Sequence, residues 1–338
     1  MKPSRSRLWL GILSAGIAIA TAGSLTAAPA RAADALTTIK IGVYPGNTSS
    51  STWVIADQKG FFKREGLKAK FVNFASGPAL AAAVVSGSVD VAYGASAVSF
   101  DLAKQSSKLV VLGDFAEYIN WYIVAAKDKA KSSASAGFPA NVKSLKGMKI
   151  GVAGLGGVAN KFVYATLKSG GLSPNDVTMI AVGATNTAIP ALKNGRVDAL
   201  AAVASPEDLR QQHVDAVVVV DAGIKGNAGP AVTNVLGVID TTSRAFMKEH
   251  SDTLNKYCKA MIATVAWEKD PANFDEVSQV VAKQLGISKT MAGAELKHDL
   301  VSYTNDVTKS VWDSQPDWIT GGGKVPTYHD TVYGSCGR

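Results

Sequence analysis

Four short stretches rich in glycine, serine, threonine and asparagine are the parts of this sequence best suited to hold a ligand. They are PGNTSSST (45–52), ASGP (75–78), GLGGV (154–158) and GATNT (183–187). Each precedes a segment with helical patterning, and the start of a helix offers unpaired N–H groups and a partial positive charge. Hydroxyl and amide side chains add further donors. Such residues also cap ordinary helices, so one stretch carries little weight, whereas four favour a binding site.

Residues suited to catalysis or to metal binding are sparse. No G-x-S-x-G motif or CxxC pair is present, and the four stretches contain no acid–base pair, lysine or arginine. We therefore expect a protein that is not an enzyme and that has no catalytic residue, metal or cofactor. The histidines are scattered, and we interpret all four as surface or capping residues: His213, His250, His298 and His329.

The segment Gly154–Ala159 (GLGGVA) fits the G-x-G-x-x-A pattern of dinucleotide-binding loops. Asp176 follows about twenty residues later, as the pattern requires, but it precedes the second predicted strand instead of ending it. The secretory signal described below would also carry the chain away from soluble NAD. We interpret the glycines as positions where backbone N–H groups approach another ligand.

The elements that must position these stretches follow a β–α–β–α–β order. Predicted strands at 38–43, 69–74 and 89–93 alternate with predicted helices at 53–65 and 78–86. A left-handed glycine is expected to end each helix, at 66 and 87. This alternation predicts a parallel sheet with crossover helices, in which the loops that precede helices lie at the carboxyl ends of the strands.

The same order of elements occurs a second time. IGV at 150–152 repeats IGV at 41–43, and GRVD at 195–198 repeats GSVD at 87–90. Between them we expect helices at 162–168 and 188–194 and a strand at 177–182. Two similar units in tandem predict two lobes. The repeated aspartates, Asp90 and Asp198, stand beside a helix end and a strand start in both units, so we interpret them as structural.

The rest of the chain is expected to connect and cover these units. We predict an exposed connection at 127–146, strands at 217–220 and 235–239, and helices at 243–268, 271–285 and 289–312. Trp121 and Tyr122 begin a connecting strand and are candidates to line a ligand cleft.

The N-terminus has the pattern of a secretory signal. Lys2, Arg5 and Arg7 precede an uncharged run over residues 8–28, and small residues follow around Ala30. We expect cleavage, no lipid anchor because no cysteine is near, and a soluble periplasmic protein. Without the four basic residues of 1–32, the net charge of +8 falls to +4 (8 − 4), which gives no basic block for nucleic acid or anionic lipid. Cys258 and Cys336 could pair there or stay as thiols, and the sequence leaves both open.

The segment Ala56–Leu67 (ADQKGFFKREGL) resembles the GFFKxEGL segment of ABC-transporter substrate-binding proteins of the nitrate/sulfonate/taurine/bicarbonate class, which are related to thiamine-precursor binders. The SGP turn at 76–78, the two V-D phrases and LKG at 145–147 follow in that family's order. The resemblance covers about residues 38–240.

The resemblance implies a type II periplasmic-binding fold: two α/β lobes with a ligand cleft between them. Together with the signal peptide predicted at 1–32, it gives an expected first lobe at 33–120 plus 230–338 and a second at 121–229. Capture of a small solute and delivery to an ABC permease by a monomer would follow, with no nucleic acid involved. Helix N-termini favour a sulfonate or carboxylate. The alternatives are an enzyme on the same fold or a protein that presents ligand to a membrane sensor.

The expected ligand-binding residues come from the corresponding loops, with the serines just beyond the two V-D strands and the tryptophan added: Asn47, Thr48, Ser49, Ser50, Ser76, Gly77, Pro78, Ser96, Trp121, Gly156, Gly157, Thr185, Asn186 and Ser205.

Overall fold

We analysed a computed structural model of the chain. The residues that it describes are 35–43, 50–74, 77–106, 108–116, 121–183, 185–224, 226–232, 235–304, 306–322, 325–334 and 336. The signal peptide predicted at 1–32 lies outside them.

The first sheet contains β1 (Thr37–Val43), β2 (Leu67–Asn73), β3 (Val91–Ala95), β4 (Leu109–Ala116) and β10 (Val238–Ser243), in the order β2-β1-β3-β10-β4. β1 runs parallel to β2 and β3, as predicted. β10 runs antiparallel to β3 and β4, so the complete sheet is mixed. The predicted strand at 235–239 also begins too early, because β10 starts at Val238.

The second sheet contains β5 (Tyr122–Ala126), β6 (Lys149–Val152), β7 (Thr178–Ala181), β8 (Ala199–Ala201) and β9 (Ala216–Asp221), in the order β7-β6-β8-β5-β9. β6 pairs in parallel with β7 and β8, and β5 is antiparallel to β8 and β9. The two sheets therefore have the same pattern, including an antiparallel strand in fourth place that comes from a distant part of the chain.

The repeated IGV phrase lies in β1 and β6, which stand second in the strand order of the two sheets. Ile41 lies opposite Phe71 and Val91, and Ile150 lies opposite Met179 and Ala199. A Cβ on Gly42 would lie 2.6 Å from Leu80 Cδ1, and one on Gly151 would lie 2.9 Å from Leu200 Cδ2. A side chain would overlap the layer above the sheet in both units, which explains why glycine stands at both places.

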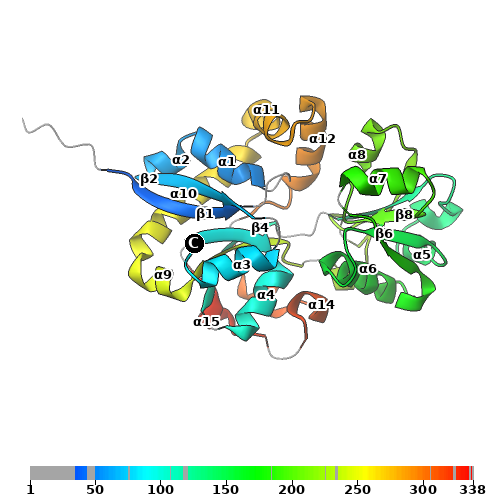
Figure 1. The fold of residues 1–338 in the computed structure, drawn as a ribbon, viewed down its shortest axis with the longest axis horizontal. Helices are drawn as coiled ribbons and strands as arrows, with labels where there is room; N and C mark the ends of the chain where they lie inside the picture. Colours follow the sequence, from blue (N-terminus) through cyan, green and yellow to red (C-terminus); the bar gives the residue numbers. More distant parts are fainter. Residues whose placement is uncertain are drawn as a thin grey trace, which may run out of the picture. The chain divides into compact units, whose positions relative to one another are not determined.

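Helices of the first unit are α1 (Ser51–Gln58), α2 (Phe61–Arg64), α3 (Gly77–Val85) and α4 (Ser96–Gln105), and α3 and α4 lie side by side (Figure 1). The single helix predicted at 53–65 is interrupted at Gly60, whose φ of 73° is left-handed. Gly66 and Gly87 have φ of 75°, as the predicted helix ends require.

Helices of the second unit are α6 (Val158–Ser169), α7 (Thr185–Lys193) and α8 (Pro206–Gln211). Asp176 is the acidic residue that the dinucleotide-binding pattern would place at the end of a strand. It instead ends a short 3-10 helix, Pro174–Asp176.

The prediction of an exposed connection at 127–146 is right only in part, since much of the segment is exposed but not all of it. The segment contains a 3-10 turn (Ser132–Ser135) and α5 (Ala140–Lys143) and buries several residues. Asn141 is fully buried, and its Nδ2 donates to the carbonyl oxygens of Val219 and Asn227, both at 2.9 Å. A buried amide that satisfies two carbonyl groups holds this segment against the sheet.

The C-terminal part is helical: α9 (Arg244–Glu249), α10 (Ser251–Lys269), α11 (Phe274–Leu285), α12 (Lys289–Asp299), α13 (Lys309–Asp313), α14 (Asp317–Thr320) and α15 (Tyr328–Thr331). The helix predicted at 243–268 is divided at His250, and that predicted at 289–312 ends at Asp299. None of the helices in the described part of the chain is long and apolar enough to span a membrane.

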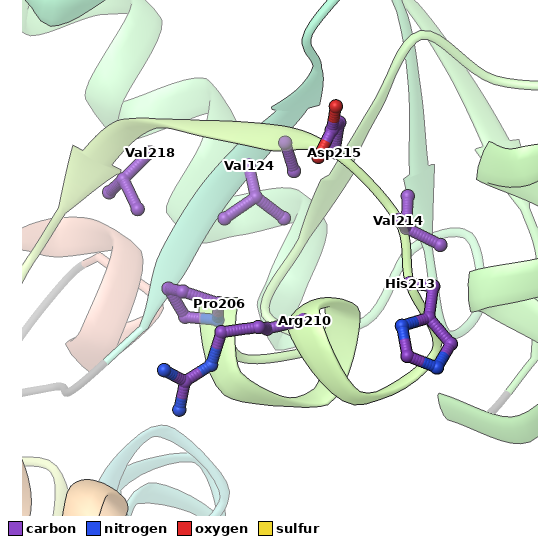
Figure 2. Close-up of a pocket in the computed structure, with 8 residues that line it drawn as sticks. Val124, Pro206, Arg210, His213, Val214, Asp215 and Val218 are labelled. Carbon is purple, nitrogen blue, oxygen red and sulfur yellow. The ribbon is translucent and has the colours of Figure 1, made fainter.

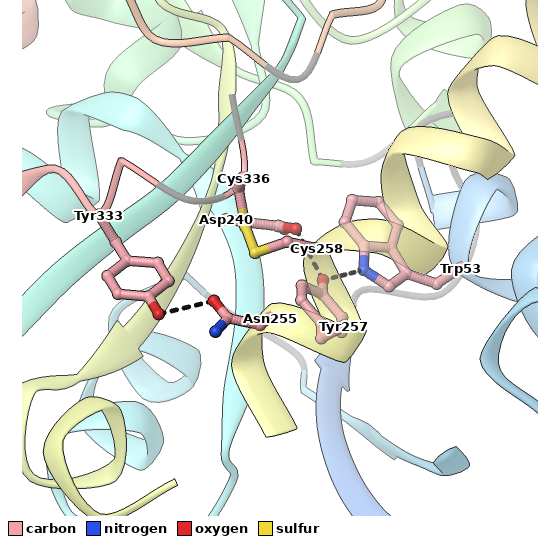
Figure 3. Close-up of a disulfide and its surroundings, with 7 residues drawn as sticks. All are labelled: Trp53, Asp240, Asn255, Tyr257, Cys258, Tyr333 and Cys336. Atoms are coloured by element: carbon pink, nitrogen blue, oxygen red, sulfur yellow. Dashed lines mark hydrogen bonds between the residues drawn. A yellow bond between two sulfur atoms is a disulfide. The ribbon is translucent and has the colours of Figure 1, made fainter. Parts of the chain in front are cut away.

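A disulfide joins Cys258 of α10 to Cys336 near the end of the chain, with the two Cα atoms 4.6 Å apart (Figure 3). Beside it, Tyr333 Oη donates to Asn255 Oδ1 at 2.8 Å. The Tyr333 N–H donates to the Val111 carbonyl oxygen at 2.7 Å, on the edge strand β4. The C-terminal segment is thus fixed to both α10 and the edge of the first sheet.

The core under the first sheet contains a buried chain of polar groups. Trp53 Nε1 donates to Tyr257 Oη at 2.7 Å, and Tyr257 Oη donates to Asp240 Oδ2 at 2.6 Å (Figure 3). Burial raises the pKa of Asp240, and the bond from Tyr257 opposes this only in part. These bonds join α1, α10 and β10 through the centre of the core.

Candidate functional site

Asp90 and Asp198 have the same structural role in the two units. The Lys40 N–H donates to Asp90 Oδ2 at 2.7 Å, and the Lys149 N–H donates to Asp198 Oδ2 at 2.8 Å. Each aspartate N–H donates in return to the carbonyl oxygen of the same lysine. Each carboxylate therefore joins β1 or β6 to the residue just before β3 or β8, and the structural interpretation of both aspartates is confirmed.

Four helices begin after a parallel strand, as the small-residue stretches predict. They are α1 after β1, α3 after β2, α6 after β6 and α7 after β7. Gly77 and Pro78 are the first two residues of α3. The predicted ligand residues Asn47, Thr48, Ser49 and Ser76 lie outside the described residues.

The first turn of α1 is buried and polar. Gln284 Nε2 of α11 donates to Ser50 Oγ at 2.8 Å. Ser51 is buried, and its Oγ has no hydrogen-bond partner in the described part of the chain. The Thr52 hydroxyl faces the carboxyl group of Glu268 on α10. Burial raises the pKa of Glu268 to about 8, and the contact with Thr52 acts in the opposite direction.

The first turns of α6 and α7 are more open. Gly156, with φ of 76°, and Gly157 are exposed before α6, and Thr185 and Asn186 are exposed at the start of α7. Thr185 Oγ1 donates to the Val203 carbonyl oxygen at 2.7 Å. Asn160, in the first turn of α6, is buried, and its Oδ1 has no partner among the described residues. This turn therefore offers N–H groups and a buried amide oxygen.

Ser96 and Ser205 are not equivalent, although they follow the same phrase. Ser96 is buried at the start of α4, and its hydroxyl donates to the Leu236 carbonyl oxygen. Ser205 caps α8 by accepting from the Asp208 N–H at 3.1 Å, and its hydroxyl donates to Glu295 Oε1 at 2.6 Å. Both hydroxyl protons are thus engaged within the protein.

Trp121 is half-buried and packs edge-on against Phe162, with ring centroids 5.4 Å apart. Tyr122 follows it and lies against His298, with centroids 4.9 Å apart.

The interpretation of all four histidines as surface or capping residues is wrong for His298. Its Nε2 lies 2.9 Å from Asp221 Oδ1, and its Nδ1 lies 3.5 Å from Asp299 Oδ1. Burial lowers the pKa of His298, but Asp221 and Asp299 outweigh burial and raise it to about 9. Sequence spacing could not find this pair, because Asp221 ends β9 and His298 lies on α12.

A cavity of about 450 Å³ lies between α8 and β9, and none of the predicted ligand residues lines it, although its lining includes Pro206, which follows Ser205 (Figure 2). Valine side chains form part of its lining, and Arg210, His213 and Asp215 supply its polar groups. Arg210 is already paired with Glu207. In the part of the chain that the structure describes, no group of three histidine, cysteine or acidic residues could hold a metal ion.

Comparison with known proteins identifies the fold. The alkanesulfonate-binding protein SsuA from Xanthomonas axonopodis pv. citri, solved bound to MOPS, is 18% identical with a TM-score of 0.67, over 88% of this chain and 98% of that chain. The periplasmic nitrate-binding protein NrtA from Synechocystis PCC 6803 is 16% identical with a TM-score of 0.59, over 78% and 70%. A Candida albicans protein with the generic periplasmic binding protein fold is 17% identical with a TM-score of 0.59, over 88% and 96%.

No protein in a search of curated proteins matches this chain. The structural neighbours confirm the predicted periplasmic-binding fold and, with the family match, the resemblance to the nitrate and sulfonate class. Residues 32–282 match the model of the NMT1-like family. Because this match covers most of the sequence, the chain belongs to the NMT1-like family.

Proposed function

We propose that this protein is a periplasmic solute-binding protein that captures a small sulfonate or carboxylate and delivers it to an ABC permease. The observation that carries the proposal is the placement of four helix N-termini, α1, α3, α6 and α7, directly after parallel strands in two sheets of the same topology. In such sheets ligands bind at the carboxyl ends of the strands. Backbone N–H groups and helix dipoles at those ends favour an anionic group.

The side chains in these first turns also suit such a ligand. The buried Ser51 hydroxyl has no partner in the described part of the chain and can donate to an anion, whereas Asn160 Oδ1 only accepts and would need a donor group on the ligand. Glu268, with a pKa of about 8, is mostly uncharged at neutral pH and so does not repel an anion from the first turn of α1. SsuA and NrtA, whose names give a sulfonate and nitrate as ligands, share the fold.

Export and the division into lobes belong to the same proposal. The basic, apolar and small-residue pattern of 1–32 supports cleavage and a periplasmic location. The lobes expected at 33–120 plus 230–338 and at 121–229 agree with the strand lists, since β1–β4 and β10 fall in the first set and β5–β9 in the second.

A thermal-shift panel of alkanesulfonates, carboxylates and nitrate tests the proposal. Binding to the folded state alone raises Tm, by an amount that grows with the logarithm of the ligand excess over Kd. We expect at least one sulfonate or carboxylate to raise Tm, and native mass spectrometry of the purified protein to show a retained anion. A flat panel together with a ligand-free mass would contradict the proposal.

Asn186→Ala tests whether the start of α7 contacts the ligand. Loss of one buried hydrogen bond to the ligand is expected to weaken binding about tenfold, measured by titration calorimetry with the best anion of the panel. Asn194→Ala is the matched control, because Asn194 is exposed just beyond the other end of α7. Equal affinity of the two variants would remove Asn186 from the site.

A further inference from the structure

Helix α12 makes two polar contacts to the second unit, one to the N-cap of α8 and one to the end of β9. Ser205 Oγ donates to Glu295 Oε1 at 2.6 Å, and His298 Nε2 lies 2.9 Å from Asp221 Oδ1. The Tyr122 ring covers one side of the imidazole. We call these two pairs the α12 contact. Its partners stand at strand or loop ends: Ser205 begins α8, and Asp221 ends β9.

The Asp221 carboxylate is held in place for this contact. It is buried, and its Oδ1 also accepts from the Gly223 N–H at 2.9 Å. His298 is half-buried between Asp221 and Asp299, so its charged form is favoured at neutral pH. A charge-assisted hydrogen bond in such a setting is stronger than a neutral hydrogen bond. It also contributes more to stability than an ion pair on the exposed surface does.

Helix α12 is also connected, through α11, to the first turn of α1. α12 packs on α11, and α11 packs on α1. One apolar cluster, which includes Ile55, Val281 and Leu296, joins these three helices. Gln284 of α11 then donates to Ser50 at the start of α1. The α12 contact and the first candidate helix N-terminus are therefore parts of one packed layer.

We propose that Glu295 and His298 are positioning residues that hold the layer of α1, α11 and α12 against the second sheet and thereby strengthen binding at the proposed solute site. This inference rests on the proposed function. The α12 contact joins the half of the protein that contains the first sheet and the C-terminal helices to the half that contains the second sheet. A bond between the halves favours the state in which they meet, and a ligand that contacts both halves then binds more tightly.

The charged groups around the contact set its dependence on pH. Asp221 and Asp299 face His298, and the carboxyl group of Glu295 feels Asp208, Asp299 and Glu207. Burial raises the pKa of Glu295 to about 7, against the bond from Ser205, and that of His298 is about 9. Both values lie above the ordinary ones. For Glu295, burial outweighs the bond from Ser205, although that bond is stronger to the charged carboxylate. The state in which the α12 contact is made is therefore favoured most at low pH and less as pH rises through 7 and then 9.

Spin-label distances test the inference without any ligand. Lys63→Cys on α2 and Lys193→Cys on α7 place labels at exposed positions beside the two sheets, and the native cysteines are already paired. At pH 7 we expect one dominant distance in this background, and a broader distribution with longer distances after His298→Ala. The background at pH 10 should resemble His298→Ala at pH 7. In Glu295→Gln, the distance distribution should no longer change near pH 7 but should still change near pH 9.

His329→Ala is the matched control, because His329 is exposed on α15. If His298→Ala lowers Tm below a usable value, Asp221→Asn at pH 7 gives the same test with less loss of packing. Identical distributions in the background, His298→Ala and Asp221→Asn would overturn the inference. A ligand panel without any Tm shift, combined with the expected change in distance, would contradict only the proposed function.

With ethanesulfonate as probe, we expect His298→Ala to weaken affinity about tenfold, and an unchanged Kd would overturn the link to binding.

Discussion

The two units share one topology but differ in what supports the helix N-termini. In the first unit, α10 and α11 cover the first turn of α1, so its hydroxyl groups are buried. In the second, Gly156, Gly157, Thr185 and Asn186 are exposed. The repeated sequence therefore specifies the sheet and the helix starts of each unit. The C-terminal helices add a difference, because they cover the helix start of α1 in the first half only. Substitutions in the first half should affect stability, and those at the start of α7 mainly binding.

The largest effect is expected from the disulfide, which has no counterpart in the second unit. Cys336→Ser opens a loop of 78 residues and is expected to cost roughly 2–4 kcal/mol of unfolding free energy, measured by urea denaturation. Hydrogen exchange should increase in α10 and β4 and stay unchanged in β5–β9. Reductant on the wild type is the control and should have the same effect. Faster exchange spread equally over both sheets would contradict this local role.

The buried carboxyl group of Glu268 should make the stability of the first half depend on pH. Its pKa of about 8 in the folded protein exceeds the ordinary value of 4.5, so the folded state binds the proton more tightly. Its stabilising contribution is complete below pH 4.5 and is lost as pH rises through 8, and each unit of difference between the two pKa values is worth about 1.4 kcal/mol.

Glu268→Gln should remove this slope in urea denaturation between pH 5 and 9. Glu249→Gln is the control, because Glu249 is exposed on α9. Equal slopes in the wild type and Glu268→Gln would show that the carboxyl group does not titrate in this range.

Asp90 and Asp198 provide the test of equivalence. Asp90→Ala and Asp198→Ala each leave one strand N–H, of Lys40 or Lys149, without its carboxylate acceptor. We expect each to lower the unfolding free energy by about 1–3 kcal/mol, and by similar amounts. The asparagine variants keep an acceptor oxygen and should recover part of the loss. A loss confined to one aspartate would break the symmetry that the matching bonds indicate.

Local patterns predicted the parts of the fold that repeat. Strand and helix alternation, the glycine helix ends and the two V-D phrases depend on neighbours in sequence, and the structure contains them. The placement of β5 and β10 as antiparallel strands could not be predicted, because each pairs with strands far away in the chain. The pairing of His298 with Asp221 could not be predicted for the same reason, because the two residues are far apart in the chain. The break at Gly60 was missed because the apolar pattern continues through it into Phe61 and Phe62.

The smallest effects are expected from the two serines, and they distinguish the units most finely. Ser96→Ala removes a bond to the neutral Leu236 carbonyl oxygen, and Ser205→Ala removes a helix cap and a bond to Glu295, so each should cost about 1 kcal/mol. The Ser205 hydroxyl lowers the pKa of Glu295, which burial raises to about 7, because it donates to the charged form.

The cost of Ser205→Ala should therefore be greater at pH 8 than at pH 5, whereas that of Ser96→Ala should be the same at both. Urea denaturation of the two variants and the wild type at the two pH values measures this difference. Glu295→Gln combined with Ser205→Ala is the control, because without the carboxylate the pH difference should vanish. A pH-independent Ser205→Ala would mean that its bond to Glu295 adds nothing beyond the helix cap, and the two serines would then be equivalent after all.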